Sequence, residues 1–519
     1  MLNSYPTNMI AKTYGSSVYG VDASIITVEV NVINGTHFHM VGLPDNAVKE
    51  SKERVESALR DNGFTFPRRK VVVNLAPADV KKEGSAYDLP IALGILSASG
   101  QIDAPDLGKY IMLGELALDG VLRPIKGVLP IAIEARKQGF KGFILPKENA
   151  NEAAIVNNLD VIPIEHLSEA IDFLNGELII KPLVKDTREI FEDTQNDYDA
   201  DFSAVQGQEN IKRALEIAAA GGHNAIMIGP PGSGKTMLAK RLPSILPPLS
   251  LHEALETTKI HSVAGKLGAH ADLIARRPFR SPHHTISDVA LVGGGGNPQP
   301  GEISLSHNGV LFLDELPEFK RSVLEVMRQP LEERMVTISR ARMSVDYPAN
   351  FMLIASMNPC PCGYYNHPEK ECVCAPGTVQ RYLNKISGPL LDRIDLHVEV
   401  TPVSFDEMTA NRTTEKSEDI RKRVIEARKI QLERFKDYDD IHCNAMMRPQ
   451  MVKDVCAIDS VGKNILKVAM EKLGLSARAY DRILRVARTI ADLHGSEKIK
   501  TEYLAEAIQY RSLDREGWA

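Results

Sequence analysis

Three apolar runs in the middle of the chain predict buried β-strands, and each run ends in residues suited to binding a nucleotide. They cover residues 226–228, 309–313 and 351–357. Strand-like and helix-like segments also alternate through the first 185 residues, and the pattern becomes helical from about residue 421. Because short apolar runs separated by amphipathic helices are typical of α/β folds, we expect an α/β protein that ends in a helical domain.

A glycine-rich loop follows the first of these runs. It matches the phosphate-loop pattern GxxxxGK[ST], and the residues expected to bind nucleotide are Gly229, Pro230, Pro231, Gly232, Ser233, Gly234, Lys235 and Thr236. Glycines let backbone N–H groups approach a polyphosphate at the start of a helix. Lys235 is expected to reach the β- and γ-phosphates, and the Thr236 hydroxyl is expected to bind Mg²⁺.

The other two apolar runs deliver the remaining groups that hydrolysis needs. The second run ends in Asp314 and Glu315, and the third ends in Asn358. In a parallel sheet the carboxyl ends of the strands lie together, so Asp314 is expected to hold Mg²⁺ and Glu315 to polarise the attacking water. Asn358 is expected to sense the γ-phosphate. We therefore predict an enzyme that hydrolyses ATP with Mg²⁺ as its metal cofactor.

The overall composition is that of an ordinary soluble protein. Of the 519 residues, 43% are hydrophobic and 25% are charged, and no apolar run approaches the length of a membrane span. The amino terminus has no basic segment followed by an apolar one, so we expect a cytoplasmic protein without a membrane partner. A net charge of −6 confines any nucleic-acid site to a local patch or channel.

Changes in composition along the chain predict its domain boundaries. The chain length suits about three domains. Residues 186–200 are rich in acidic and polar side chains, which favours an exposed linker. The linker separates an α/β domain at 1–185 from a nucleotide-binding core at 201–415, and a helical domain at 416–519 completes the chain.

Four of the six cysteines lie in one short segment, residues 360–374. Two Cys-x-Cys pairs can supply four thiolates to one tetrahedral ion, and a reducing compartment favours metal over disulfide. We expect a structural Zn²⁺ held by Cys360, Cys362, Cys372 and Cys374. Free thiols are the alternative, because each pair is separated by one residue instead of the commoner two to four.

Two stretches between the phosphate loop and the Asp314-Glu315 strand, residues 277–284 and 293–301, have no ordinary core pattern. Residues 335–347 predict two short strands about a turn, and Arg340 and Arg342 at the turn could either grip a phosphate backbone or be plain exposed charges. The glycine-rich residues 293–301 predict an unstructured tip.

Two sets of arginines are candidates for a place near the nucleotide. Arg393 lies between two aspartates, which by itself indicates a surface ion pair. Further along, arginines follow a helical spacing with aliphatic residues on the opposite face. These are Arg478, Arg482, Arg485 and Arg488.

Residues 114–149 of the first domain resemble the proteolytic domain of Lon proteases, which cuts peptides with a serine and a lysine. The segment 82–88 resembles the serine segment, but Ser85 stands one place off and Ala86 takes the position of the nucleophile. The lysine position falls on Leu129. Without an amine to activate a hydroxyl, a serine is a poor nucleophile. The resemblance therefore implies a Lon-like domain of the ribosomal S5 domain 2 type that is not proteolytic.

Taken in order, these pieces resemble an AAA+ ATPase of the magnesium-chelatase-like group, and within that group the YifB/ComM family. Residues 278–284, 358–363 and 388–397 carry the resemblance together with the phosphate loop. The resemblance implies a homo-oligomeric ring, expected to be a hexamer. It also implies two catalytic arginines: Arg393 as an arginine finger at the neighbour's γ-phosphate, and Arg478 as a second-sensor arginine from a helical lid.

The same resemblance implies how the ring acts. Residues 293–301 resemble a helix-2 insert and residues 335–347 a pre-sensor-1 hairpin, and both would face the central pore. The expected function is DNA branch migration in homologous recombination or natural transformation, with branched or single-stranded DNA as the partner. Two alternatives stay open: a magnesium-chelatase-type insertase motor, and an ATP-driven protein-remodelling factor or protease, which Leu129 opposes.

Overall fold

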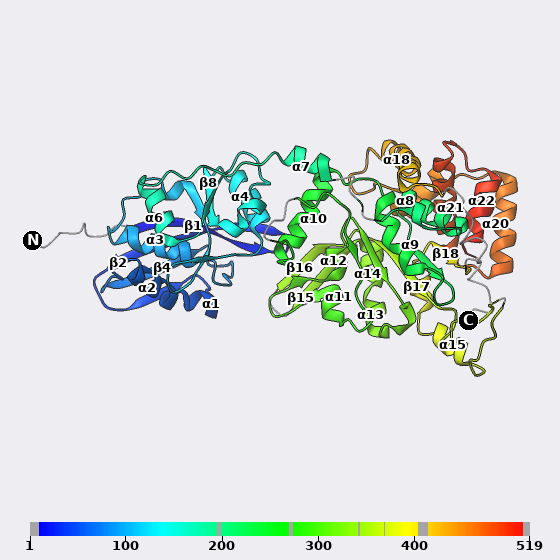
Figure 1. Cartoon of the computed structure of the whole chain (residues 1–519), viewed down its shortest axis with the longest axis horizontal. Helices are drawn as coiled ribbons and strands as arrows, with labels where there is room; N and C mark the ends of the chain where they lie inside the picture. Colours follow the sequence, from blue (N-terminus) through cyan, green and yellow to red (C-terminus); the bar gives the residue numbers. More distant parts are fainter. Residues whose placement is uncertain are drawn as a thin grey trace, which may run out of the picture. The chain divides into compact units, whose positions relative to one another are not determined.

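The computed structural model describes residues 10–194, 198, 200–268, 273–340, 343–367, 369–402 and 414–511. The chain forms two compact units (Figure 1). The first unit contains residues 1–194 and 251–275, and the second contains residues 195–250 and 276–519. The segment 251–275 lies inside the predicted 201–415 core but packs with the first unit. Within the described ranges, every helix is too short or too polar to cross a membrane.

A seven-stranded mixed sheet forms the first unit. Its strands run in the order β3-β4-β2-β1-β5-β8-β9. They are β1 (Ile10–Tyr19), β2 (Asp22–Ile33), β3 (Phe38–Val41), β4 (Lys70–Ala76), β5 (Tyr110–Met112), β8 (Gly142–Pro146) and β9 (Asp160–Ile164). The strands β1, β2 and β4 pair antiparallel, and the other neighbouring strands pair parallel. A two-stranded ribbon, β6 (Glu115–Leu116) with β7 (Leu122–Arg123), accompanies this sheet.

Helices alternate with these strands, as the sequence pattern predicts for an α/β unit. They are α1 (Asn46–Lys49), α2 (Ser51–Asp61), α3 (Asp88–Ala98), α4 (Val128–Lys137), α5 (Ala150–Ala153), α6 (Leu167–Asn175), α7 (Thr187–Thr194) and α10 (Leu251–Val263), with the 3₁₀ turns η1 (Leu107–Lys109) and η2 (Lys147–Asn149). The helix α7 covers half of the predicted linker, and the buried Thr187 hydroxyl donates to the carbonyl of Ile155 at 2.9 Å. That half is therefore helical and anchored.

The helix α10 is tied to the first unit by buried polar contacts. The carboxylate of Glu152 accepts hydrogen bonds from the Ser262 hydroxyl and, at 2.8 Å, from the backbone N–H of Leu129. Burial raises the pKa of Glu152, and these donors oppose the shift. The N–H of Gly127 donates to the carbonyl of Ser262 at 3.2 Å. The segment therefore belongs to the first unit by packing, although it lies between two strands of the second unit in sequence.

The second unit is built on a five-stranded sheet in which every neighbouring pair is parallel. The order is β11-β14-β17-β10-β18. The strands are β10 (Ala225–Ile228), β11 (Phe279–Arg280), β14 (Val310–Leu313), β17 (Met352–Met357) and β18 (Leu396–Glu399). Every residue of β10, β14 and β17 is buried, which explains why each reads as an uninterrupted apolar run. Their carboxyl ends meet at one edge of the sheet.

Short helices and two hairpins surround this sheet. The helical segments are η3 (Phe202–Ala204), α8 (Glu209–Gly221), α9 (Lys235–Arg241), η4 (Leu242–Ile245), α11 (Asp288–Val292), α12 (Glu302–Leu305), η5 (Leu316–Glu318), α13 (Arg321–Val326), α14 (Arg328–Glu333), α15 (Thr378–Leu383) and α16 (Gly388–Leu391). One hairpin pairs β15 (Met335–Arg340) with β16 (Met343–Pro348). The other pairs β12 (Gly293–Gly294) with β13 (Gln299–Pro300).

The glycine-rich segment 293–301 is more ordered than its composition indicated. The sequence predicted an unstructured tip, but residues 293–294 and 299–300 form paired strands, so the prediction is wrong for these residues. Gly293 and Gly294 have φ of +113° and +152°, which glycine adopts readily. The hydroxyl of Tyr347 also donates to the carbonyl of Pro298 at 2.8 Å. A contact from the neighbouring hairpin therefore holds this glycine-rich segment in a defined conformation.

Residues 417–509 are mainly helical and pack on the sheet of the second unit (Figure 1). Its elements are α18 (Ser417–Arg434), η6 (Asn444–Met446), α19 (Pro449–Val455), α20 (Ser460–Leu473), α21 (Ala477–Leu493) and α22 (Thr501–Gln509). One continuous apolar core joins these helices to β10, β14 and β17. The helices and the nucleotide-binding sheet therefore share one core, so movement of the helices relative to the sheet would disturb the packing of that core.

A buried carboxylate, Asp395, links the sheet to the helix α21. Asp395 pairs with Arg482 of α21, and its other oxygen accepts the Asn224 N–H at 3.0 Å. His223 Nδ1 lies 3.5 Å from the same carboxylate. Burial alone would raise the pKa of Asp395, but Arg482 and His223 hold it well below its ordinary value. The ionised form is therefore the stable one in the folded protein.

Replacing Asp395 by Asn should destabilise the second unit. Arg482 would lose its buried partner, and breaking a buried ion pair costs about 3–5 kcal/mol. Because the pKa of Asp395 is lowered on folding, its stabilisation is present above the ordinary value of 3.8 and is lost as the pH falls below it. Calorimetric unfolding of Asp395→Asn should therefore differ from wild type most at neutral pH. Asp392→Asn, a half-buried position nearby, is the control; an equal loss there would contradict the assignment.

Candidate nucleotide-binding site

The phosphate loop connects the buried strand β10 to the helix α9. Gly229 leaves the strand with its N–H donating to Met357 at 3.2 Å, and a Cβ at Gly229 would collide with the carbonyl oxygen of Val400. Gly232 and Gly234 have φ of +78° and +86°. Steric contact at one glycine and backbone conformation at two others therefore explain the composition of this loop.

Lys235, the first residue of α9, reaches back over the loop. Its Nζ donates to the carbonyls of Gly229 and Pro230, both at 2.8 Å, and lies 3.3 Å from the side-chain oxygen of Asn358. Burial lowers the pKa of Lys235, whereas the carboxylates of Asp314 and Glu315 act to raise it. The ammonium group is thus held at the centre of the loop, where phosphate oxygens can replace its carbonyl partners.

Asp314 is the meeting point of three elements. The Thr236 hydroxyl from α9 donates to Asp314 Oδ2 at 2.6 Å, and the Ser356 hydroxyl from β17 donates to Asp314 Oδ1. The backbone N–H of Glu315 donates to Oδ1 at 3.1 Å. A carboxylate and a hydroxyl in contact are ligands that suit Mg²⁺. The predicted residues Thr236 and Asp314 therefore fit a magnesium site.

Glu315 lies beside Asp314 in a left-handed backbone conformation, with φ of +55°. Its side chain is 56% exposed, and the carboxylate lies 3.5 Å from Nδ1 of His284. The rings of His283 and His284 are 4.1 Å apart. In the sequence, residues 277–284 lacked a core pattern and contributed to the family resemblance, but the contact between His284 and Glu315 was not predicted. The two residues follow neighbouring strands but lie far apart in the sequence, so their contact leaves no periodic pattern that could predict it.

The two predicted catalytic arginines lie in different environments. Arg393 is buried, donates to the carbonyl of Pro389 at 2.6 Å and pairs with Glu332 at 2.6 Å. It is therefore not the surface ion pair that its flanking aspartates indicated. Arg478 is exposed in the first turn of α21. Within the described part of the chain, neither arginine hydrogen-bonds to the phosphate loop.

The two predicted DNA-binding arginines are only partly described. Arg340 is exposed at the end of β15, and Arg342 lies outside the described residues. The side chain of Arg340 lies against the other hairpin, because a Cβ built on Gly294 would be 3.2 Å from its Nη2. With the Tyr347–Pro298 hydrogen bond, this contact joins the two hairpins into one surface, here called the paired hairpins (residues 293–300 and 335–348).

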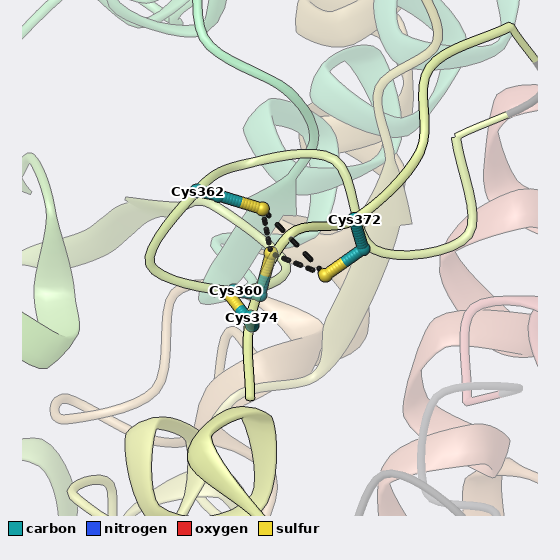
Figure 2. A group of neighbouring side chains, drawn as sticks. All are labelled: Cys360, Cys362, Cys372 and Cys374. Carbon is teal, nitrogen blue, oxygen red and sulfur yellow. Dashed lines mark hydrogen bonds between the residues drawn. The ribbon is translucent and has the colours of Figure 1, made fainter. Parts of the chain in front are cut away.

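The four predicted metal ligands come together in one cluster (Figure 2). Their sulfur atoms all lie within 4.8 Å of one another. The Cys360–Cys362, Cys362–Cys372 and Cys360–Cys372 sulfur distances are 3.3, 3.6 and 3.8 Å. A tetrahedral ion with metal–sulfur bonds of about 2.3 Å separates its sulfurs by about 3.8 Å. The spacing therefore fits a single tetrahedral metal ion and is too long for a disulfide bond.

The thiols of this cluster influence one another's ionisation. Burial opposes ionisation of Cys362, but the N–H groups of Tyr364 and Val373 and the neighbouring thiols lower its pKa to about 6. The pKa of Cys372 is raised, although the Cys374 N–H favours its thiolate. One thiolate therefore forms readily and discourages the next, and a bound cation would relieve this repulsion.

The Lon-related positions in the first unit do not form a serine–lysine pair. The Ser85 hydroxyl donates to the carboxylate of Glu115, and the Lys82 ammonium donates to the carbonyl of Pro77. Leu129 is fully buried. A hydroxyl paired with a carboxylate and separated from the amine lacks the base that such a nucleophile needs.

A phosphate loop after an inner strand of a parallel sheet, facing an Asp-Glu pair on a neighbouring strand end, defines a phosphate-loop ATPase with an α/β AAA+ fold. Comparison with models of known protein families supports this class. "Magnesium chelatase, subunit ChlI" matches residues 201–408, "Subunit ChlI of Mg-chelatase" matches 28–149, and "Magnesium chelatase, subunit ChlI C-terminal" matches 414–511.

Relatives that match almost the whole chain place it in a narrower family within this class of ATPases. The chain is 44% identical over 510 residues to competence protein ComM of Haemophilus influenzae, which covers 98% of both chains. It is 44% identical over 514 residues to YifB of Salmonella typhimurium, again covering 98% of each. Lon protease 2 of Bacillus subtilis is 29% identical over 189 residues, 32% of this chain and 33% of that one. The chain belongs to the ComM/YifB family of magnesium-chelatase-like ATPases.

Ser356 offers a test of the magnesium site, because it touches Asp314 but is not expected to touch nucleotide. Removing its hydroxyl in Ser356→Ala takes one donor from Asp314, and loss of such a supporting contact lowers metal affinity about 10–100-fold. The Mg²⁺ concentration that gives half-maximal ATPase activity should rise, while maximal activity at saturating Mg²⁺ changes less. Ser304→Ala, at another fully buried serine of the same unit, is the control. Equal Mg²⁺ dependence in all three proteins would contradict the assignment.

Proposed function

We propose that this chain is an ATP-driven motor that assembles into a hexameric ring and drives branch migration of DNA. The observation that carries the proposal is the pair of contacts that joins Arg340 and Tyr347 of one hairpin to the glycine-rich hairpin. In sequence the paired hairpins carry two arginines, Arg340 and Arg342, against one acidic residue, Asp346. Full-length similarity to a protein named for competence supports a role on incoming DNA.

The nucleotide site supplies the energy in this proposal. Lys235 and Thr236 hold ATP and Mg²⁺, Asp314 completes the magnesium site, and Glu315 orients the attacking water. The side chain of Asn358, in contact with Lys235, reports the state of the γ-phosphate to β17. ATP and Mg²⁺ supply the phosphoryl-transfer chemistry, and the described side chains bind, orient and polarise.

Assembly completes the site. Arg393 would act as the arginine finger on the neighbouring subunit's nucleotide, exchanging Glu332 for the γ-phosphate. Arg478, exposed on α21, would reach the nucleotide as the second-sensor arginine when the helical lid closes. The buried pair of Asp395 and Arg482 supports this division of roles, because it ties the segment of Arg393 to the helix that carries Arg478.

DNA would be held by the paired hairpins. In this proposal residues 293–301 form the helix-2 insert, residues 335–347 form the pre-sensor-1 hairpin, and both face the pore. Arg340 and Arg342 bind backbone phosphates without reading bases. The first unit then serves as a Lon-like, non-proteolytic domain, and the helical end of the chain as the lid.

A structural Zn²⁺ at Cys360, Cys362, Cys372 and Cys374 is the second part of the proposal. The sulfur spacing and the chemistry of four thiols fit zinc better than an oxygen-preferring ion. Purified protein should contain about one zinc per chain. Cys374→Ser should lose it, and Cys456→Ser, at a buried cysteine outside the cluster, should keep it. The zinc content of the three proteins is measured by elemental analysis. Wild type that contains no zinc after purification without a chelator would contradict the assignment.

A magnesium-chelatase-type insertase motor is the second candidate function. The three family models all carry the name of the ChlI subunit, including the one that matches the first unit. Such a motor would need a porphyrin-binding partner to stimulate its ATPase activity, and DNA would not replace that partner. The protease alternative is less favoured, because Leu129 is buried and, among the residues that the structure describes, Ser85 has no amine in hydrogen-bond contact.

The proposal is tested by ATPase rate and strand displacement with forked and four-way DNA. Wild type should hydrolyse ATP faster with DNA and displace strands. Glu315→Gln should bind ATP but lose about three orders of magnitude in hydrolysis. Arg340→Ala with Arg342→Ala should keep basal ATPase activity and lose displacement, because two phosphate contacts are removed.

Arg60→Ala, at an exposed arginine of the first unit, should behave as wild type. If DNA neither binds nor stimulates a verified ring at low salt, the branch-migration proposal fails. Stimulation by a porphyrin-loaded partner in the same assay would then favour the insertase.

A further inference from the structure

The segment that carries the four cysteines begins and ends at the nucleotide site. It leaves β17 at Asn358, whose side-chain oxygen lies 3.3 Å from Lys235 Nζ. It returns at α15, where the backbone of Asn358 lies close enough to the buried Tyr382 hydroxyl to oppose the rise that burial causes in the pKa of that hydroxyl. Residues 359–381, here called the cysteine loop, are thus closed at their base on the residue that contacts the phosphate-binding lysine.

The cysteine loop also touches the phosphate loop directly. Gly363 has φ of +85°, and a Cβ at this position would collide with the ring of Pro231. Pro231 follows Pro230, whose carbonyl accepts a hydrogen bond from Lys235 at 2.8 Å. Only glycine meets both requirements at position 363: a left-handed conformation and close approach to the proline ring. The conformation of the phosphate loop is therefore limited on one side by the cysteine loop.

The cysteine cluster fixes the turn that makes both contacts. Cys360 follows Asn358 by two residues, and Cys362 immediately precedes Gly363. The N–H of Gly363 donates to the carbonyl of Cys360 at 3.0 Å, and both sulfurs face Cys372 from the far arm of the loop (Figure 2). Cross-linking the two arms through one ion would hold this turn, whereas without the ion only weak hydrogen bonds between the thiols join the arms.

We propose that the cysteine cluster is a metal-dependent positioning element for the phosphate loop, so that metal occupancy sets the affinity for ATP. The inference rests on the proposed ATP and zinc binding and adds the coupling between them. The cysteines act through Asn358 and Pro231 and touch no nucleotide. Loss of the metal loosens the turn, Gly363 no longer supports Pro231, and the loop carbonyls that hold Lys235 lose their fixed geometry.

The first test distinguishes the effect of the contact between position 363 and Pro231 from the effect of backbone strain alone. Gly363→Ala introduces a side chain against Pro231 in a left-handed conformation. Gly377→Ala introduces the same side chain in the same loop, at φ of +74°, with open space around it. Both variants are compared with wild type by titration with a fluorescent ATP analogue and by elemental analysis. Gly363→Ala should bind the analogue about tenfold more weakly while retaining zinc, and Gly377→Ala should bind as wild type.

The second test removes the metal from the full-length protein. Zinc is stripped with a chelator, the chelator is removed, and Mg²⁺ is restored; Mg²⁺ prefers oxygen ligands and does not refill a thiol site. Affinity for the analogue should fall about tenfold, should recover when Zn²⁺ is added back, and should be similarly low in Cys374→Ser. Circular dichroism of each sample verifies that the fold is kept.

The outcomes distinguish the inference from its premises. Wild type that binds no ATP analogue overturns the proposed function, and wild type that binds the analogue but holds no metal overturns the zinc site. Where both bind, unchanged affinity after stripping and in Gly363→Ala overturns the positioning role. An equal loss in Gly377→Ala also overturns it, because backbone strain alone would then explain the effect.

Discussion

The carboxylate of Asp314 is the interaction on which the geometry of the site depends. It accepts hydrogen bonds from Thr236 in α9 and from Ser356 in β17, and it stands at the end of β14. The two strands are neighbours in a parallel sheet, and β10, which leads into α9, lies on the other side of β17. One carboxylate therefore sets the separation of three chain segments. A shift of any strand changes the distance between the proposed metal ligands before a nucleotide arrives.

The same carboxylate also determines the charge balance around Lys235. Burial disfavours the ammonium form, and the carboxylates of Asp314 and Glu315 favour it. The acidic groups that the proposed reaction uses for other purposes therefore also favour the charged form of the lysine. Bound nucleotide would bring additional negative charge, and the positive charge of Mg²⁺ would offset part of it. Such a balance limits the cost of removing water from charged groups.

The sequence predicted the parts of this site whose signal is local. The phosphate loop has a fixed spacing, the strands before Asp314 and Asn358 are uninterrupted apolar runs, and the two Cys-x-Cys pairs lie a short loop apart. Other features depend on contacts between distant segments and have no local signal: His284 beside Glu315, Glu332 beside Arg393, and Gly363 against Pro231. Packing of residues 251–275 with the first unit belongs to this second group, because the sequence of α10 does not show which unit it packs against.

The ion pair of Arg393 with Glu332 bears on how the proposed ring would form. Arg393 is buried, but the side chain of Glu332 is 49% exposed, so water can replace the arginine when the pair separates. The hydrogen bond to Pro389 lies within the same short segment and can persist. Exchanging a half-solvated carboxylate for a doubly charged γ-phosphate is favourable only where a neighbour presents nucleotide. Assembly and nucleotide binding would then be coupled reciprocally, because each supplies the partner that the other lacks.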